Sequence, residues 1–377
     1  MQLTKYKLGD LIVQRREKNK NYDAPIRGVS KEGFIRAKQQ EADTSIYNVF
    51  YKYDFVFNPA RMELNSIALN LEYEKALCSS LYEVFYVKDE NVVLPEFLNL
   101  HIKREEFARH CDYIGLGSAR EYCRFANISE FDIELPPIEV QREIVEADRL
   151  IKRRIHLNEQ MIAKLEETAQ ALYRKMFVDG IDKENLPEGW RMGTIDSICE
   201  VKDGTHDSPK PVDVGNPLIT SVHLNSWSVS LQSAYFISAR DYSKINERSL
   251  VETGDILMSM IGTIGVVSYV LYEQVDFAVK NMAIFKTSRN SKYAEYVLFN
   301  LKSNEMKQYI VESTSGSTQG YVTLNTLRCI PLIIPDECII EDFHCIVKEL
   351  ISHIWNLTKE NEILTELQSL LLAKMGQ

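Results

Sequence analysis

The feature that most constrains this chain is a central stretch of about forty residues that contains neither glycine nor proline. It lies within Leu135–Gly180, where Pro136 and Pro137 are typical of a helix start and Gly180 of a helix end. At about 1.5 Å per residue, a helix of this length measures about 60 Å. Because the mean globular helix has only about 11–12 residues, this helix requires an extended packing partner.

Apolar residues recur in this stretch with the seven-residue period of a coiled coil. In heptad notation the d positions are Ile144, Ile151, Asn158, Leu165 and Leu172, and the a positions are Asp148, Ile155, Ile162, Ala169 and Met176. Most of these side chains are apolar, so the pattern predicts packing against a second helix rather than against a sheet.

The C-terminal stretch repeats the pattern 199 residues later. There the d positions are Phe343, Leu350, Leu357, Leu364 and Leu371, and the a positions are Val347, Ile354, Asn361, Gln368 and Met375. The match without gaps runs from 117–176 to 316–375. We therefore expect two long helices, 135–180 and 334–377, packed as an antiparallel coiled coil. Antiparallel pairing would bring Asn158 and Asn361 within one turn, where they could fix the helix register; alternatively, both face solvent.

The remaining residues form two regions, 1–134 and 181–333, that we expect to be globular. β-branched and aromatic residues predict strands at 46–50, 54–57, 66–69 and 81–87. Helices are predicted at 95–109 and 293–310. The expected fold class is α/β (α+β), with two globular domains, two long helices and an internal pseudo-twofold repeat. Asp54 and Asp255 occupy similar strand entries, at an offset of 201 residues.

Composition excludes several classes of protein. With 45% hydrophobic and 26% charged residues, the chain is an ordinary globular protein, and no apolar run is long enough to span a bilayer. The N-terminus lacks a signal peptide, and the seven cysteines form no C-x-x-C pair, which favours a reducing cytoplasm. Cys338, His344 and Cys345 are expected to be ordinary helix residues, so no metal site is predicted. The net charge of −10 requires any DNA-binding surface to be local.

Catalytic motifs are not evident. Asn58-Pro59-Ala60-Arg61 departs from the Asn-Pro-Pro-aromatic motif of adenine methyltransferases, because the second proline and the aromatic residue are missing. No glycine-rich loop for S-adenosylmethionine follows a strand. We therefore expect neither a catalytic residue nor a cofactor in this chain.

Taken together, three motifs resemble the specificity (S) subunit of type I restriction-modification systems across nearly the whole chain. They are Asp203-Gly204-Thr205-His206, Gly316-Ser317-Thr318-Gln319, and Leu135-Pro136-Pro137 followed by Gln141-Arg142 and the helix to Lys175-Met176-Phe177. The resemblance implies two target-recognition domains that read the halves of a bipartite, asymmetric DNA site. It also implies two modification (methyltransferase) subunits docked on the helices, together with restriction subunits. S-adenosylmethionine would then be bound by the methyltransferase, and ATP and magnesium by the restriction subunit, in a bacterial or archaeal cytoplasm.

Candidate DNA-binding residues lie in polar loops of both regions. In the first region they are Arg15, Arg16, Lys18, Lys20, Arg61, Ser118 and Arg120; in the second they are Lys202, Thr205, His206, Lys210, Ser317, Thr318 and Gln319. Cationic side chains suit phosphates, and Thr and Gln suit base edges or phosphates. Three alternatives remain open: the loop at 14–22 is merely solvated, Arg61 forms a structural ion pair, and His206 closes its own loop through Asp207.

Two other functions compete with DNA recognition by a non-catalytic subunit. One is a stand-alone enzyme that modifies or cuts DNA, which the missing motifs disfavour. The other is a two-lobed scaffold that does not bind DNA. The first half lacks an Asp-Gly-Thr-His sequence near its start and has Gly-Ser-Ala-Arg at 117–120, so we expect the two half-sites to differ in sequence.

Overall fold

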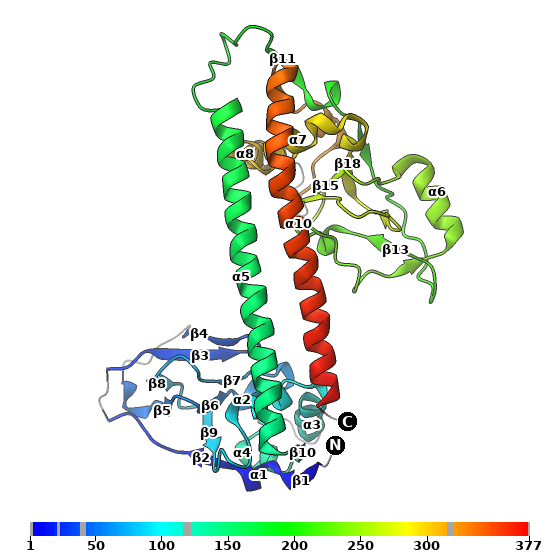
Figure 1. Cartoon of the computed structure of the whole chain (residues 1–377). Helices are drawn as coiled ribbons and strands as arrows, with labels where there is room; N and C mark the ends of the chain where they lie inside the picture. Colours follow the sequence, from blue (N-terminus) through cyan, green and yellow to red (C-terminus); the bar gives the residue numbers. More distant parts are fainter. Residues whose placement is uncertain (1–2, 21–22, 38–42, 116–121, 315–319, 376–377) are drawn as a thin grey trace. The chain divides into compact units, whose positions relative to one another are not determined.

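The computed structural model describes residues 3–20, 23–37, 43–115, 122–314 and 320–375. It divides into two compact units, Met1–Arg154 with Ile363–Gln377, and Ile155–Glu362. Figure 1 shows the elements of each unit. Within the described residues, no helix is both long and apolar enough to cross a membrane.

The first unit contains two four-stranded sheets. One has the order β2 (Ile12–Arg15), β9 (Glu83–Val87), β6 (Phe55–Phe57), β7 (Ile67–Leu69), and its strands are antiparallel. The other has the order β4 (Gly33–Arg36), β3 (Ile26–Ser30), β8 (Lys75–Cys78), β5 (Asn48–Tyr51), with β3 parallel to β8. A separate pair joins β1 (Thr4–Lys7) to β10 (Asp132–Leu135). The helices are α1 (Leu8–Leu11), α2 (Pro95–Ile102), α3 (Glu105–Gly115) and α4 (Phe125–Ser129).

The second unit repeats this arrangement. Its antiparallel sheet has the order β12 (Val201–Asp203), β18 (Met282–Phe285), β15 (Ile256–Ser259), β16 (Val267–Tyr269). A smaller sheet has the order β14 (Phe236–Ile237), β13 (Asn216–Ile219), β17 (Ala278–Val279), with β13 parallel to β17. β11 (Arg191–Thr194) pairs with β19 (Pro331–Ile334). The helices are α6 (Ala239–Ser249), α7 (Ala294–Lys302), α8 (Asn304–Glu312) and α9 (Leu324–Arg328).

The internal repeat is confirmed, and it extends beyond the stretch that the sequence reveals. Residues 83, 95, 105, 125, 132 and 138 begin β9, α2, α3, α4, β10 and the first long helix, and each has a counterpart that begins 199 residues later. Upstream of β9 the offset varies, but the four-stranded antiparallel sheet keeps its strand order. The two globular regions therefore share one scaffold although their sequences have diverged.

Asp54 and Asp255 are equivalent buried residues that immediately precede β6 and β15. The carboxylate of Asp54 accepts the Tyr51 amide at 2.8 Å, and that of Asp255 accepts the Glu252 amide at 2.7 Å. The first pairs with Arg15, and the second pairs with Lys286. Each half thus ties a strand entry to a basic side chain within, or directly after, another strand of the same sheet.

Both helices predicted within the globular regions are broken, so their predicted bounds are wrong. The region 95–109 contains the end of α2 at Ile102 and the start of α3 at Glu105, and the region 293–310 contains α7 and α8. In the second half the cause is Ser303, whose extended backbone ends α7 and whose hydroxyl accepts the Met306 amide at 3.1 Å as the N-cap of α8. The predicted strand at 46–50 also shifts, because a 3₁₀ turn occupies Thr44–Ile46 before β5 begins at Asn48.

The two long helices are α5 (Ile138–Phe177) and α10 (Glu337–Lys374). In the second unit they are antiparallel, because Asn158 pairs with Asn361 while Phe177 packs against Phe343 with ring centroids 5.0 Å apart. The Asn158 amide donates to the Asn361 side-chain oxygen at 2.9 Å and to Glu360 at 3.0 Å. Asn158 is only 3% exposed, which excludes the solvent-facing alternative for this residue. That the pair sets the register stays a prediction.

In the first unit the same two helices are joined by Gln368, which donates to Asp148 at 2.7 Å. The first turn of α5 is fixed to the globular part by Gln141, which is fully buried. Its side chain accepts the Leu94 amide at 3.1 Å and donates to the carbonyls of Val92 and Pro136, both at 2.9 Å. Glutamine in this position therefore joins α5 to the segment before α2.

Acidification is expected to destabilise the first unit through His101. Burial and the neighbouring Arg104 lower the pKa of this imidazole from 6.5 to about 4. Below pH 6.5 the unfolded chain binds a proton that the folded chain excludes, so about 3 kcal/mol of stability is lost as the pH falls to 4. The variant His101→Asn introduces the residue found at the equivalent position of the second half, Asn300. Urea unfolding of this variant should show that the loss of unfolding free energy between pH 6.5 and 4 is smaller than in the wild type. An unchanged pH dependence would contradict this assignment.

Candidate nucleic-acid interface

The loop after β12 in the second unit is held close to the segment that links β17 and β18. The amide of Gly204 donates to Met282 O at 2.8 Å, and that of Thr205 donates to Val279 O at 3.0 Å. A Cβ atom on Gly204 would lie 2.5 Å from Val279 O, so only glycine fits here. The Thr205 hydroxyl accepts the Asp207 amide at 3.1 Å, which turns the chain back on itself.

A polar network beneath this loop orients its histidine. One ring nitrogen of His206 lies 3.0 Å from the Asp203 carboxylate, and the other lies 2.9 Å from the side-chain oxygen of Asn281. Arg248 of α6 lies 3.4 Å from the same Asp203 carboxylate, and Lys280 donates to Ser208 at 2.5 Å. His206 thus closes the loop, but through Asp203 and Asn281 rather than through the Asp207 that the sequence suggested. The ring remains 59% exposed in this fixed orientation.

The other sequence-predicted residues of this half have different environments. Lys210 is exposed, whereas Thr205 is buried and serves the turn itself. Lys202 lies 3.6 Å from Glu200 and is largely covered. Ser317, Thr318 and Gln319 lie outside the described residues. The structure adds Arg248, Lys280 and Asn281, which sequence reasoning missed because they lie at least 38 residues beyond the loop and no motif links them to it.

In the first unit, Arg15 is engaged inside the protein. Its guanidinium forms two hydrogen bonds to the Asp54 carboxylate, at 2.6 and 3.0 Å. It also stacks over the rings of Tyr51 and Tyr86, at 4.9 and 4.6 Å from their centroids. These contacts with one carboxylate and two aromatic rings favour a supporting role for Arg15 next to the loop that follows β2.

The rest of that loop is more accessible. Arg16 and Lys18 are exposed and each makes one local hydrogen bond, to Gln14 at 2.8 Å and to Ile46 O at 3.1 Å; Lys20 is also exposed. Arg61 is exposed in a distorted 3₁₀ turn, and no ion pair involving it is found among the described residues. Ser118 and Arg120 lie outside the described residues. The structure therefore brings Arg16, Lys18 and Lys20 into one loop and leaves Arg61 on a separate turn.

The three candidate metal ligands on α10 do not form a site. His344 bonds to Glu295 of α7 at 2.6 Å, while Cys338 and Cys345 are exposed on the helix. Across the described residues, no group of three or more potential ligand side chains is suitably placed for a metal ion.

Comparison with known proteins identifies the family. The model of the type I restriction modification DNA specificity domain matches the chain twice, at residues 2–167 and 187–368. The chain belongs to this family. The specificity subunit of the type I restriction enzyme MjaIX from Methanocaldococcus jannaschii is 25% identical over 311 residues, covering 75% of this chain and 68% of that protein. The specificity subunit of the HindI enzyme from Haemophilus influenzae is 21% identical over 368 residues, with coverage of 76% and 77%.

A solved structure supports the fold of this specificity subunit. The crystal structure of the type I restriction-modification S subunit from M. genitalium matches with a TM-score of 0.60 and 15% identity, and covers 99% of this chain and 96% of that one. Family membership makes the chain a DNA sequence-recognition subunit without catalytic activity. A stand-alone enzyme and a scaffold unrelated to DNA are not favoured.

Two loop residues of the specificity subunit should have separable effects on DNA binding. If Lys210 pairs with a phosphate, Lys210→Gln should weaken binding to all sequences alike and lower the slope of log K against log salt by about 1. If His206 contacts a base edge, His206→Ala should instead relax the preference at one base position. Salt-dependent titration of the subunit, in complex with its methyltransferase, against a panel of duplexes distinguishes the two effects. Equal losses on every duplex for both variants would contradict the assignment of His206.

Proposed function

We propose that the two halves of this specificity subunit read two different half-sites of a bipartite, asymmetric DNA site. The observation that carries the proposal is the duplicated sheet with unlike loops at its edge strand. After β12 the loop is Asp203–Lys210, anchored by α6; after β2 it is the basic segment 16–20. One scaffold that presents different polar loops suits two recognition surfaces.

The side chains of these two loops suggest how phosphate contacts and base contacts would divide the work of DNA binding. Exposed lysine and arginine side chains of these loops would neutralise phosphates and fix the position of each domain on the duplex. Side chains held from below, such as His206, would present hydrogen-bonding edges to bases. Since the chain carries a net charge of −10, we propose that part of the DNA affinity comes from partner subunits.

We also propose that the long helices dock two methyltransferase subunits and, through the assembled complex, restriction subunits. Three residues of α10 in the first unit, Ile363, Leu367 and Leu370, are four and three positions apart and therefore share a helix face. They are 65%, 50% and 61% exposed, which is unusual for three adjacent large apolar side chains. A partner surface would cover this stripe.

Catalysis would then belong to the partners. S-adenosylmethionine would be bound by the methyltransferase subunits, and ATP and magnesium by the restriction subunits. We place the complex in the cytoplasm of a bacterial or archaeal cell, where DNA modification and defence against phage take place.

Sequencing of methylated DNA from cells that express this chain with its methyltransferase tests the proposal. We expect methylation at a motif of two specified half-sites separated by an unread spacer. Replacement of residues 1–134 with the corresponding region of a relative should change one half-site only. A continuous motif, or a change in both half-sites, would contradict the bipartite assignment. Methylation by the isolated chain would restore the enzyme alternative, and the absence of sequence-specific binding with the methyltransferase present would restore the scaffold alternative.

A further inference from the structure

One short turn of the second recognition domain is attached to both long helices of its unit. The turn is Leu224–Val229, closed by a β-bridge between its ends and by the Asn225 amide, which donates to Ser228 O at 2.9 Å. Trp227 of this turn is 4% exposed. Its indole N–H donates to the Glu166 carboxylate of α5 at 3.1 Å.

Lys302, at the end of α7, completes the contact with α5. Its ammonium donates to the other oxygen of Glu166 at 2.8 Å and lies 3.9 Å from the centroid of the Trp227 ring. Its side chain is only 9% exposed. A single carboxylate of α5 therefore receives two donors from the domain, and one of these is a cation removed from water.

The same turn reaches α10 through Tyr272. The Tyr272 hydroxyl accepts the Val229 amide at 2.9 Å and donates to Val229 O at 3.1 Å. Its ring meets Trp355 of α10 edge to face, with centroids 5.0 Å apart. Lys359 of α10 lies over both rings, 4.5 Å from Tyr272 and 4.7 Å from Trp355. We call the six side chains of these two contacts the two-helix clamp: Glu166, Trp227, Tyr272, Lys302, Trp355 and Lys359.

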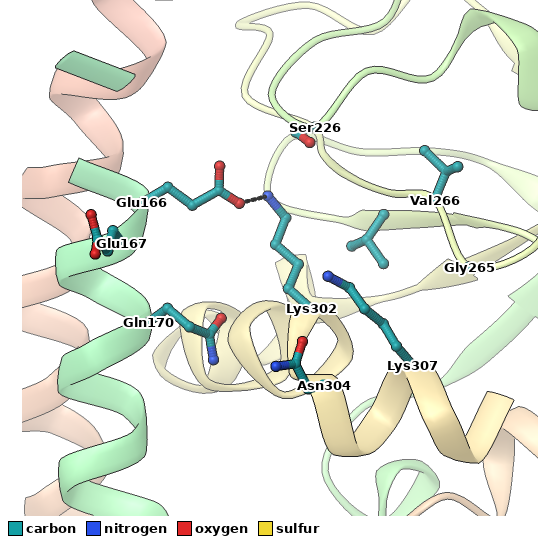
Figure 2. A pocket seen from close by; sticks show the side chains of 10 residues that line it. Glu166, Glu167, Gln170, Ser226, Gly265, Val266, Lys302, Asn304 and Lys307 are labelled. Carbon is teal, nitrogen blue, oxygen red and sulfur yellow. Dashed lines mark hydrogen bonds and ion pairs between the residues drawn. The ribbon is translucent and has the colours of Figure 1, made fainter. Parts of the chain in front are cut away.

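Open space adjoins the α5 side of the clamp. A groove of about 450 Å³ is lined by Glu166, Gln170, Lys302, Asn304 and Lys307, among others. Figure 2 shows Glu166 and Lys302 reaching toward one another at this groove. The groove leaves room for Glu166 and Lys302 to move apart once their pair is broken, although Gln170 of α5 also donates to Phe299 O of the domain at 3.4 Å.

The clamp is specific to the second half of the repeat. At the 199-residue offset, Glu166 corresponds to Thr365, and Trp355 and Lys359 correspond to His156 and Gln160. Lys302 corresponds to Lys103, whose ammonium donates to the carbonyls of Lys31 and Ile67 instead of to a helix carboxylate. The first half thus keeps the lysine without the acid or the aromatic partner.

We propose that the two-helix clamp determines which spacer lengths between half-sites the protein accepts, because it fixes the angle between the second recognition domain and the helix pair of its unit. This inference rests on the proposed reading of a bipartite site. Glu166, Lys302, Trp355 and Lys359 act as positioning residues, since they contact the domain and the helices rather than the bases.

The test compares the spacer tolerance of clamp variants with that of a matched control. Glu166→Gln, Trp355→Leu and Lys359→Gln are each expressed with the methyltransferase, and methylation is sequenced at sites whose spacer is longer or shorter by one base pair. Glu167→Gln is the control, because within the part of the chain that the structure describes the neighbouring Glu167 pairs with Lys164 of the same helix, at 2.7 Å. The clamp variants should raise methylation at altered spacers at least about tenfold relative to the natural site, with both half-site sequences unchanged. The wild type and the Glu167→Gln variant should show no such increase in methylation at altered spacers.

A merely structural role gives a different result. Lower stability would reduce methylation at all sites together and leave the permitted spacer unchanged, and that outcome would overturn the inference. If Glu166→Gln does not fold because Lys302 loses its partner, the spacer tolerance of the α10 variants Lys359→Gln and Trp355→Leu tests the inference instead. Failure of the proposed function itself would be visible separately, as a wild-type motif that is not bipartite.

Discussion

Gly204→Ala is expected to abolish recognition of the second half-site while leaving recognition of the first intact. The added Cβ would overlap Val279 O at 2.5 Å and Val279 C at 2.9 Å, both backbone atoms that cannot rotate away. The loop from Asp203 to Lys210 must then move, and His206 loses its place between Asp203 and Asn281. If the displaced loop loses two base contacts of about 1–3 kcal/mol each, discrimination at this half-site falls at least about thirtyfold.

Competition binding measures this effect. The complex of specificity and methyltransferase subunits is titrated with three duplexes: the natural site, one with the first half-site scrambled, and one with the second half-site scrambled. For Gly204→Ala, affinity for the natural duplex should fall to that for the duplex with a scrambled second half-site, whereas scrambling the first half-site should still weaken binding. Retention of the full preference for the second half-site would show that this loop does not read it.

Lys286→Met is expected to destabilise the second unit by about 3–5 kcal/mol. Lys286 and Asp255 form an ion pair in which both side chains are almost completely buried, at 1% and 0% exposure. The ammonium also donates to Leu250 O at 3.0 Å and pairs with Glu252 at 2.7 Å. Removing the cation leaves the Asp255 carboxylate buried without its charged partner, which costs more than the pair itself contributes. Urea unfolding of the subunit, followed by tryptophan fluorescence, measures the loss.

The equivalent pair in the first unit supplies the comparison. Arg15 is 25% exposed at its side chain, so water can partly replace it at Asp54, and Arg15→Met should cost less than Lys286→Met. The double variant Asp255→Asn with Lys286→Met should recover part of the stability lost in the single variant, because no buried charge remains. An equal loss in single and double variants would contradict this account.

Sequence periodicity predicted the parts of the fold that are set by local pattern. The bounds of α5 and α10 fall within three residues of the predicted ones, because a long heptad pattern between proline and glycine signals leaves few alternatives. The helix break at Ser303 was missed because the apolar pattern continues across it, although serine is a common N-cap residue. The shared strand order of the recognition domains was also invisible, since topology can persist after side chains have diverged.

The site was predictable only where it is continuous in sequence. The Asp203–Lys210 loop was found from its motif, but Arg248 and Asn281, which hold it, come from α6 and from the turn before β18. Arg15 was chosen for its charge, and the sequence did not show that Asp54 and two tyrosine rings occupy it. Charge and spacing thus identified the loops, whereas burial and long-range partners separated contact residues from supporting ones.

The constant 199-residue offset has an evolutionary consequence. From β9 through α5, the first half aligns with the second half without a net insertion. The stretch before β9 differs in length: in the first half it runs from the start of β2 at residue 12 to the start of β9 at residue 83. In the second half the corresponding stretch runs from the start of β12 at 201 to the start of β18 at 282. Most of the length difference between the halves therefore lies in the stretch that contains the candidate DNA-binding loops. If these loops read DNA as proposed, a lineage that carries this architecture can change its DNA target through that variable stretch, while the elements from β9 through α5 stay in frame.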